Sequence, residues 1–323
     1  MLRSGKNAQS HSVEPKTVVI IGANGFIGRH LSKGLVSAGY NVTGVSKSRP
    51  ESVEFTDFLE GYNYELCAFD DVIAKSQVVI FSAGKLRPSS PFDFEVVSSE
   101  AGNVLGIARK CAEFGVEKFV MTSSGGTIYG HPDVVPVSEK MPARPINAYG
   151  YMHSIVENGL RVISNQSELK TVSLRVGNVY GPGQTSRLGQ GLIPVIFEKV
   201  RTSQKLDIRG DGTEMRDYIF IHDLVDCYAK VIENTPSYMC YNVGSEVGVS
   251  INGVVAQIEQ VLGKTVERQF TEIIHGAPGF DVILDCSRAR YDLGWKPQYS
   301  FEQGLKTYLG HIEDNPQGQG LSV

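Results

Sequence analysis

Two stretches of the sequence carry hydroxyl and aromatic side chains whose order could support acid–base chemistry. They cover residues 122–130 and 147–153, and each is expected to follow a strand. A serine at a strand end, Ser123 or Ser124, and a tyrosine at a helix start, Tyr149, can hold an alcohol or carbonyl oxygen, with tyrosinate as the general base. Alternatively, the serines cap a turn and the tyrosine only packs. The spacing alone leaves both interpretations open.

Three glycines ahead of these stretches predict a phosphate-binding turn. Gly22, Gly25 and Gly28 follow the apolar run 17–21, which indicates strand, tight turn and helix. Gly22 would let the chain turn, Gly25 would let the backbone approach a pyrophosphate, and Gly28 would let the helix pack closely. Unpaired N–H groups and the helix dipole favour an anion at that N-terminus. The turn therefore predicts a dinucleotide site.

Strands and helices alternate along the first half of the chain. Amphipathic patterns at residues 96–114 and 148–163 predict helices between the apolar runs. This order is typical of an α/β protein with a doubly wound parallel sheet, whose ligands bind beyond the carboxyl ends of the strands. The glycine turn and both hydroxyl stretches should therefore face one crevice. The predicted strands are residues 17–21, 40–45, 77–82, 118–122 and 171–175.

The composition of the sequence changes from Tyr180 onward. Glycine and proline become frequent and the apolar segments become shorter, which predicts a second, smaller lobe. Residues 1–14 and 315–323 are polar or rich in glycine and are predicted to be flexible tails.

The composition excludes several classes of function. Of 323 residues, 41% are apolar, and 31 basic against 35 acidic residues give a net charge of −4, so neither nucleic acid nor a membrane is an expected partner. The five cysteines lack metal-site or disulfide spacing, which favours a reducing compartment and no metal. The polar first residues contain no signal peptide, and no apolar run reaches about 18 residues. We therefore expect a cytoplasmic protein.

Through most of its length the sequence resembles the extended short-chain dehydrogenases/reductases of the NAD-dependent epimerase/dehydratase type, with UDP-glucose 4-epimerase-like proteins nearest. The resemblance implies a Rossmann sheet with a smaller α/β substrate lobe, interleaved in sequence. Eight motifs match in the expected order. The matching segments are residues 22–28, 82–84, 103–106, 122–124 with Tyr149, 175–183, 210–223, 241–244 and 293–297.

The resemblance also implies where the two domains begin and end. Residues 15–178 and 213–236 would form the NAD(P)-binding Rossmann domain. Residues 179–212 and 237–314 would form the nucleotide-sugar-binding lobe.

The same resemblance assigns roles to individual residues. Tyr149 and Ser124 would be catalytic with His153, and Ser123 and Thr127 are the alternatives to Ser124, because an extra glycine blurs the alignment. The implied cofactor-binding residues are Gly22, Asn24, Gly25, Phe26, Ile27, Gly28, Ser82, Ala83, Gly84, Tyr149 and His153, and the implied substrate-binding residues are Lys85, Asn178, Arg216 and Asp281.

Two of the substrate-binding roles have structural alternatives. Arg216 would contact the nucleotide diphosphate through its guanidinium fork, or would form an ion pair with Asp217 or Glu214. Asn178 would bind the diphosphate or sugar, or would only shape a turn.

His153 is the main departure from the family, which has a lysine one helical turn after the tyrosine. That lysine holds the nicotinamide ribose and lowers the pKa of the tyrosine. Histidine, with an ordinary pKa of ~6.5, is largely neutral at pH 7 and helps less. A tuned enzyme, a weakened or inactive binding relative, and an altered sequence all remain open.

The expected cofactor is NAD or NADP. The loop after the second strand offers Ser46, Lys47 and Arg49 but no carboxylate, which favours NADP because cations can pair with a 2′-phosphate. Such cations also serve solubility. The segment 277–281 lacks an arginine that relatives carry near Asp281, which removes one diphosphate contact.

The resemblance implies three possible activities. Gly125 and Gly126 stand where dehydratases of the family carry Asp-Glu, so dehydration is not expected. We expect epimerisation at C4 of a UDP-hexose through a 4-keto intermediate. The alternatives are NADPH-dependent reduction of a keto sugar and binding without catalysis. A homodimer through the helices that start near Val96 and Ala148 is also implied.

Overall fold

The computed structural model describes residues 15–50, 53, 55–61, 69–185, 191–234, 239–272 and 279–314. The two predicted tails and residues 277–278 of the departing segment lie outside the described residues.

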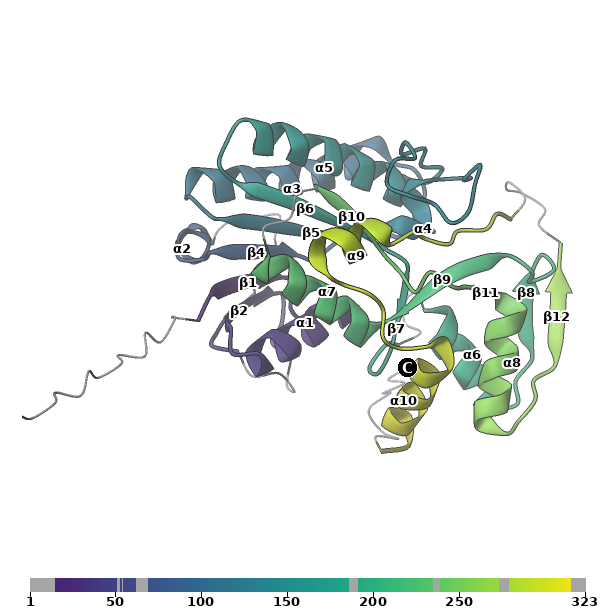
Figure 1. Cartoon of the computed structure of the whole chain (residues 1–323). Coiled ribbons are helices and arrows are strands. Elements are labelled where there is room, and N and C mark those ends of the chain that lie inside the picture. Colours follow the sequence, from purple (N-terminus) through teal and green to yellow (C-terminus); the bar gives the residue numbers. More distant parts are fainter. Residues whose placement is uncertain are drawn as a thin grey trace, which may run out of the picture.

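A seven-stranded sheet, in which every neighbouring pair is parallel, forms the larger lobe (Figure 1). The strand order is β10-β6-β5-β4-β1-β2-β3, so the direction of winding reverses between β1 and β4. This confirms the predicted doubly wound α/β sheet. Its strands are β1 Thr17–Ile21, β2 Asn41–Ser46, β3 Asp57–Glu60, β4 Val78–Phe81, β5 Lys118–Ser124, β6 Lys170–Val176 and β10 Cys240–Val243.

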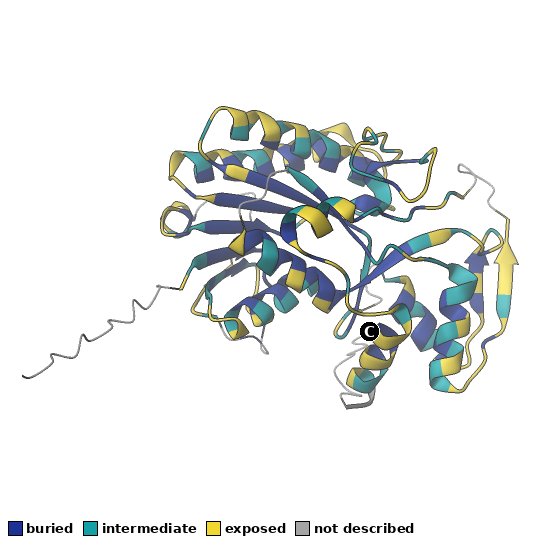
Figure 2. Cartoon of the chain, in the orientation of Figure 1, coloured by how far each residue is buried: buried dark blue, intermediate teal, exposed yellow. Residues whose placement is uncertain are grey.

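Helices cover both faces of this sheet (Figure 1). Side chains alternate along a strand, so Val18 and Ile20 join one apolar cluster while Val19 and Ile21 join the other. Figure 2 shows the strands buried between the two helical layers. Helices α1 (Phe26–Ser37) and α7 (Ile221–Glu233) contact each other on one face, and α3 (Phe94–Glu113) and α5 (Ala148–Asn165) on the other, which also carries α2 (Asp70–Ala74).

A smaller lobe stands beside the carboxyl ends of the strands (Figure 1). It holds a three-stranded sheet in the order β11-β9-β7 and a parallel pair of β12 and β8. Its strands are β7 Asn178–Tyr180, β8 Leu206–Arg209, β9 Met215–Phe220, β11 Gly248–Ser250 and β12 Arg268–Thr271, and its helices are α6 Leu192–Arg201, α8 Ile251–Leu262 and α10 Phe301–Asp314.

The strand pairing differs from the proposed division at two places. Strand β10 falls within 237–314, yet it pairs with β6 in the central sheet, while β9, within 213–236, pairs with β7 and β11 outside it. The apolar side chains of Tyr241 and Val243 are fully buried there, and β10 covers a sheet edge that β6 would otherwise expose. Helix α9 (Ser287–Leu293) packs on β10.

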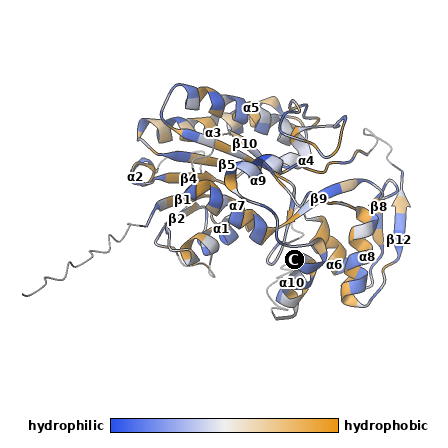
Figure 3. Ribbon diagram, in the orientation of Figure 1, coloured by the Kyte–Doolittle hydropathy of each residue, from blue (hydrophilic) through white to orange (hydrophobic). Residues whose placement is uncertain are grey.

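The helices are two-sided in composition, whereas the strands of the central sheet are mostly hydrophobic (Figure 3). Among the described residues, no helix combines the length and apolar character needed to span a membrane.

Candidate active site

The glycine turn leaves no room for side chains at two of its three glycines. Gly22 has a φ of +91°, and a Cβ there would lie 2.5 Å from the carbonyl oxygen of Ser82. A Cβ at Gly28 would collide with the carbonyl oxygen of Gly22. The turn is fixed to the sheet because the amide of Gly22 donates to the carbonyl of Val45 at 2.9 Å.

Helix α1 opens from this turn with an uncapped N-terminus. Gly25 occupies the N-cap position, no side chain caps the helix, and its first turn holds no acidic residue. The first N–H groups of such a helix suit an anion. These features, together with the close backbone approach at Gly22 and Gly28, fit the pyrophosphate of a dinucleotide.

The loop after β2 lies next to the glycine turn. Asn24 Nδ2 donates to Ser48 Oγ at 2.8 Å, which ties the two loops together. Arg49 is exposed, and its guanidinium carbon lies 5.4 Å from the centre of the Phe58 ring. Ser46 has Glu60 of the edge strand β3 as its register partner. The strand next to the end of β2 therefore carries a carboxylate, which inspection of residues 45–49 alone could not show.

The two serines at the end of β5 face opposite sides of the strand. Ser123 is 2% exposed, and its Oγ donates to Glu157 Oε1 at 2.6 Å, so this hydroxyl belongs to a buried structural network. Ser124 occupies the N-cap position of α4 (Gly125–Ile128), and its side chain makes no capping hydrogen bond. Of the two, Ser124 is the hydroxyl that a ligand could use.

Glycine is required at position 125, directly after Ser124. A Cβ there would lie 2.7 Å from Leu284 Cδ1 and 3.0 Å from the carbonyl oxygen of Arg175. A side chain at position 125 would therefore have to displace the Leu284 side chain and press on the backbone of β6.

Tyr149 is placed beside α4 by the start of α5. Asn147 caps that helix by accepting from the amide of Gly150 at 2.8 Å. A Cβ at Gly150 would lie 2.7 Å from the carbonyl oxygen of Thr127, so the first turn of α5 rests directly on α4. This contact places α4, which begins after Ser124 and holds Thr127, against the first turn of α5, which holds Tyr149.

His153 packs against Tyr149 as an uncharged ring. The two ring centres lie 4.4 Å apart at an interplanar angle of 89°. His153 is 4% exposed, and burial lowers its pKa to about 3, so the imidazole is neutral at pH 7. Burial, followed by the charge of Glu100, raises the pKa of Tyr149 to about 12. A lysine at position 153 would lower the pKa of Tyr149. The neutral His153 does not lower it, and burial together with Glu100 raises it.

Several buried polar atoms of this site have no partner within the described chain. They are both ring nitrogens of His153 and Thr127 Oγ1. Buried polar groups in folded proteins are nearly always hydrogen-bonded, so these atoms fit a site that a polar ligand completes. The ribose and nicotinamide of a dinucleotide bound at the glycine turn would supply such partners.

Glu100 is the residue of this site that sequence reasoning missed. It lies on α3, is 3% exposed, and accepts from the amides of Lys85 at 3.1 Å and Leu86 at 3.2 Å. The signal was present, because Val97, Glu100, Ala101 and Val104 follow the spacing of one buried helix face. A carboxylate among apolar positions marks a group with a fixed partner.

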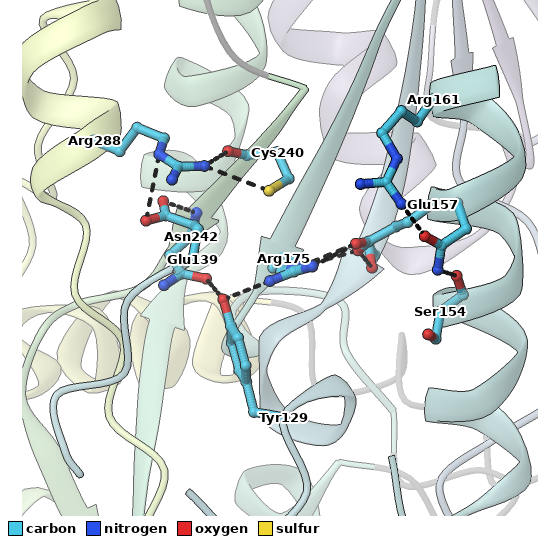
Figure 4. A network of polar contacts seen from close by, with 11 residues as sticks. Tyr129, Glu139, Ser154, Glu157, Arg161, Arg175, Cys240, Asn242 and Arg288 are labelled. Atoms are coloured by element: carbon cyan, nitrogen blue, oxygen red, sulfur yellow. Dashed lines mark hydrogen bonds and ion pairs between the residues drawn. The ribbon is translucent and has the colours of Figure 1, made fainter. Parts of the chain in front are cut away.

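A buried polar network connects helix α5 to the central sheet (Figure 4). Arg175 Nη2 pairs with Glu157 Oε2 at 2.7 Å, with side chains only 9% and 11% exposed. Arg175 Nη1 also donates to the Tyr129 hydroxyl at 2.9 Å, which donates to Asn242 Oδ1 at 2.6 Å. Glu157 lies one helical turn after His153, so the network anchors α5 to β6 and β10.

Of the four predicted substrate-binding residues, Asn178, Arg216 and Asp281 lie in the smaller lobe. Lys85 lies in the loop after β4, where its amide donates to Glu100 Oε1. Asn178 Oδ1 faces the start of α4, where a Cβ on Gly126 would lie 3.5 Å away. Arg216 Nη2 pairs with Glu214 Oε2 at 3.0 Å, and its Nη1 donates to the carbonyl of Phe280. Arg216 therefore forms the ion pair that was the alternative to a diphosphate contact, and its partner is Glu214.

Asp217 and Asp281 hold the backbone of the smaller lobe. Asp217 does not pair with Arg216, because it is buried and accepts from the amide and hydroxyl of Ser245. Asp281 Oδ1 accepts from the amide of Met215 at 2.8 Å. Within the described ranges, no group of three or more His, Cys, Asp or Glu residues could hold a metal ion.

The fold and the site define an α/β protein of the Rossmann class with a dinucleotide turn and a Ser–Tyr hydroxyl cluster at the same sheet edge. Residues 18–244 match the model of the NAD dependent epimerase/dehydratase family, and the chain belongs to that family. This confirms the resemblance drawn from the motifs.

Similar proteins cover nearly the whole chain. The dTDP-4-dehydro-6-deoxyglucose reductase of Escherichia coli is 30% identical over 91% of this chain and 97% of its own. The UDP-glucose 4-epimerase of Mycolicibacterium smegmatis is 30% identical over 93% and 99%. The structure of the Thermus thermophilus UDP-glucose 4-epimerase in complex with NAD is 26% identical, with a TM-score of 0.79 over 92% and 99%.

Proposed function

We propose that the protein is an NAD(P)-dependent nucleotide-sugar epimerase acting at C4 of a UDP-hexose through a 4-keto intermediate. The observation that carries the proposal is the placement of Ser124 and Tyr149 at the sheet edge onto which the uncapped helix α1 opens. The relatives named as UDP-glucose 4-epimerases support the substrate class.

Each residue of the site has a role in this proposal. The dinucleotide would take a hydride from C4 and return it. Tyr149 would exchange a proton with the C4 oxygen, and Ser124 would donate a hydrogen bond to the same atom. The backbone from Gly22 to Gly28 would hold the pyrophosphate, and the unpartnered nitrogens of His153 would meet the nicotinamide ribose.

Reduction of a keto sugar by NADPH is a second candidate, favoured by the surroundings of Tyr149. Oxidation of an alcohol needs a tyrosine that accepts a proton, whereas reduction of a ketone needs one that donates it. Neutral His153 and the charge of Glu100 favour the donor. The Escherichia coli relative named as a reductase supports this candidate.

The two candidates are separated by incubating the purified protein with UDP-hexoses and 4-keto nucleotide sugars, with and without added NAD(P)H. Formation of the C4 epimer without added cofactor supports the epimerase. Stoichiometric consumption of NADPH supports the reductase. Binding without turnover of any of these sugars would contradict both and leave a binding protein.

NADP is the proposed cofactor, on the strength of Lys47 and Arg49. We expect Arg49→Ala to weaken NADPH binding about tenfold, or ~1.4 kcal/mol, because it removes a partner of the 2′-phosphate. NADH binding should change little. Fluorescence titration with both cofactors measures the two dissociation constants, with Arg109→Ala on the far helix α3 as a control. Equal weakening of NADH and NADPH would refute the assignment.

A homodimer through α3 and α5 is also proposed. Phe92 and Phe94, which are 64% and 63% exposed, and Tyr151 form an aromatic patch at the start of these helices. A light-scattering mass equal to one chain would contradict the dimer.

The free thiols of Cys111, Cys227, Cys240 and Cys286 support a cytoplasmic location.

A further inference from the structure

The guanidinium of Arg216, on strand β9, is held by three acceptors of the smaller lobe. Its Nη1 donates to the carbonyl oxygen of Met215 at 3.0 Å and to that of Phe280. Its Nη2 pairs with Glu214 Oε2 at 3.0 Å, and the two side chains are only 23% and 26% exposed. The guanidinium carbon also lies 5.1 Å from the centre of the Phe280 ring. Arg216 is therefore held in one orientation, and its charge already has an anionic partner.

Gly279 packs directly against the Glu214 carboxylate, because a Cβ at position 279 would collide with Glu214 Oε1. Contact with this backbone and with Arg216 limits the movement of the carboxylate. Partly buried charges are screened less than exposed ones. A phosphate that approaches Arg216 would therefore meet a carboxylate already in place, and two anions would compete for one cation.

This cluster adjoins the segment that follows α4 in the larger lobe. The Phe280 ring, which Arg216 contacts, has its centre 4.1 Å from the centre of the His131 ring. His131 comes two residues after Tyr129, the C-cap residue of α4, and that helix begins after Ser124. Two ring contacts thus join the Arg216 guanidinium to the chain that leaves the hydroxyl cluster.

We propose that Glu214 is a specificity-determining residue that weakens the binding of phosphate at Arg216, so that a nucleoside diphosphate gains little from this cation. The inference rests on the proposed function, since the ligand is the diphosphate of a nucleotide sugar. The sequence of residues 277–281, which contains no arginine, acts in the same direction. The smaller lobe then recognises the sugar and the base more than the phosphates.

Glu214→Gln tests the inference because it keeps the shape of the side chain and removes its charge. We expect this variant to bind UDP about tenfold more tightly than the wild type, because the guanidinium becomes available to phosphate. The affinity for uridine, which has no phosphate, should not change. Isothermal titration calorimetry measures both dissociation constants. Glu198→Gln, which removes the partner of Arg201 on α6 of the same lobe, is the matched control and should leave UDP binding unaltered.

Adding Arg216→Met to Glu214→Gln shows whether the gain depends on Arg216. The double variant should bind UDP about as tightly as the wild type. The inference is overturned if folded Glu214→Gln protein binds UDP no more tightly than the wild type, if Glu198→Gln gains equally, or if the gain survives the loss of Arg216. Turnover of UDP-hexoses tests the proposed function separately. Tighter UDP binding without turnover would count against that function alone, and turnover without tighter binding would count against this inference alone.

Discussion

Replacing Tyr149 with phenylalanine is expected to lower kcat roughly 10²- to 10⁴-fold, whichever direction of hydride transfer the protein performs. The change removes one oxygen and leaves a ring of the same shape against His153. KM should change little, because the phosphate-binding turn and the smaller lobe are untouched. Steady-state rates with the sugar that proves active give kcat and KM separately.

Tyr151→Phe is the matched control for this change. Tyr151 lies on the same helix two residues later, is 40% exposed, and has no role in the site. Its rate should equal that of the wild type. If Tyr149→Phe retained the wild-type rate while Tyr151→Phe did the same, Tyr149 would not be the proton-transfer group.

The second large effect concerns stability, at the ion pair between Arg175 of β6 and Glu157 of α5. We expect Arg175→Met to lower the free energy of unfolding by about 3–5 kcal/mol, because it leaves the nearly buried Glu157 carboxylate without its cation. The Tyr129 hydroxyl loses a donor at the same time. Denaturant unfolding followed by circular dichroism measures the change.

Two further variants show whether burial of the pair is the cause. Arg109 forms an exposed pair with Glu113, with side chains 72% and 55% exposed, so Arg109→Met should scarcely alter stability. The double variant Arg175→Met with Glu157→Met removes both charges and should lose less than Arg175→Met alone. A single variant no less stable than the Arg109 control would refute this view of the network.

Local patterns were sufficient to predict most of the central sheet. The apolar run before Gly22 predicted a strand and the amphipathic run of residues 148–163 predicted a helix, because each pattern is local. The structure has β1 and α5 at these places. Strand β10 escaped because its four residues carry a weak local signal. What places it is the edge of β6, more than sixty residues earlier.

The candidate site likewise has features that the sequence could predict and features that depend on tertiary contacts. The hydroxyl cluster with Tyr149 could be predicted, since strand ends in a parallel sheet meet at one edge. The sequence could not show which serine is available to a ligand, because the Ser123 hydroxyl donates to Glu157 on helix α5. Likewise, the influence of Glu100 on Tyr149 arises only when α3 packs on α5, and no spacing in the sequence encodes that contact.

Hydride transfer at C4 with Tyr149 as the proton-transfer group is the central claim, and following the C4 hydrogen tests it most directly. One reaction contains a UDP-hexose deuterated at C4, and the other contains a 4-keto sugar with NADPH deuterated at its hydride position. We expect deuterium to remain at C4 of the epimer or to enter C4 of the reduced sugar, and Tyr149→Phe to suppress either transfer. Binding of both ligands without formation of either the C4 epimer or a reduced sugar that carries deuterium at C4 would contradict the claim.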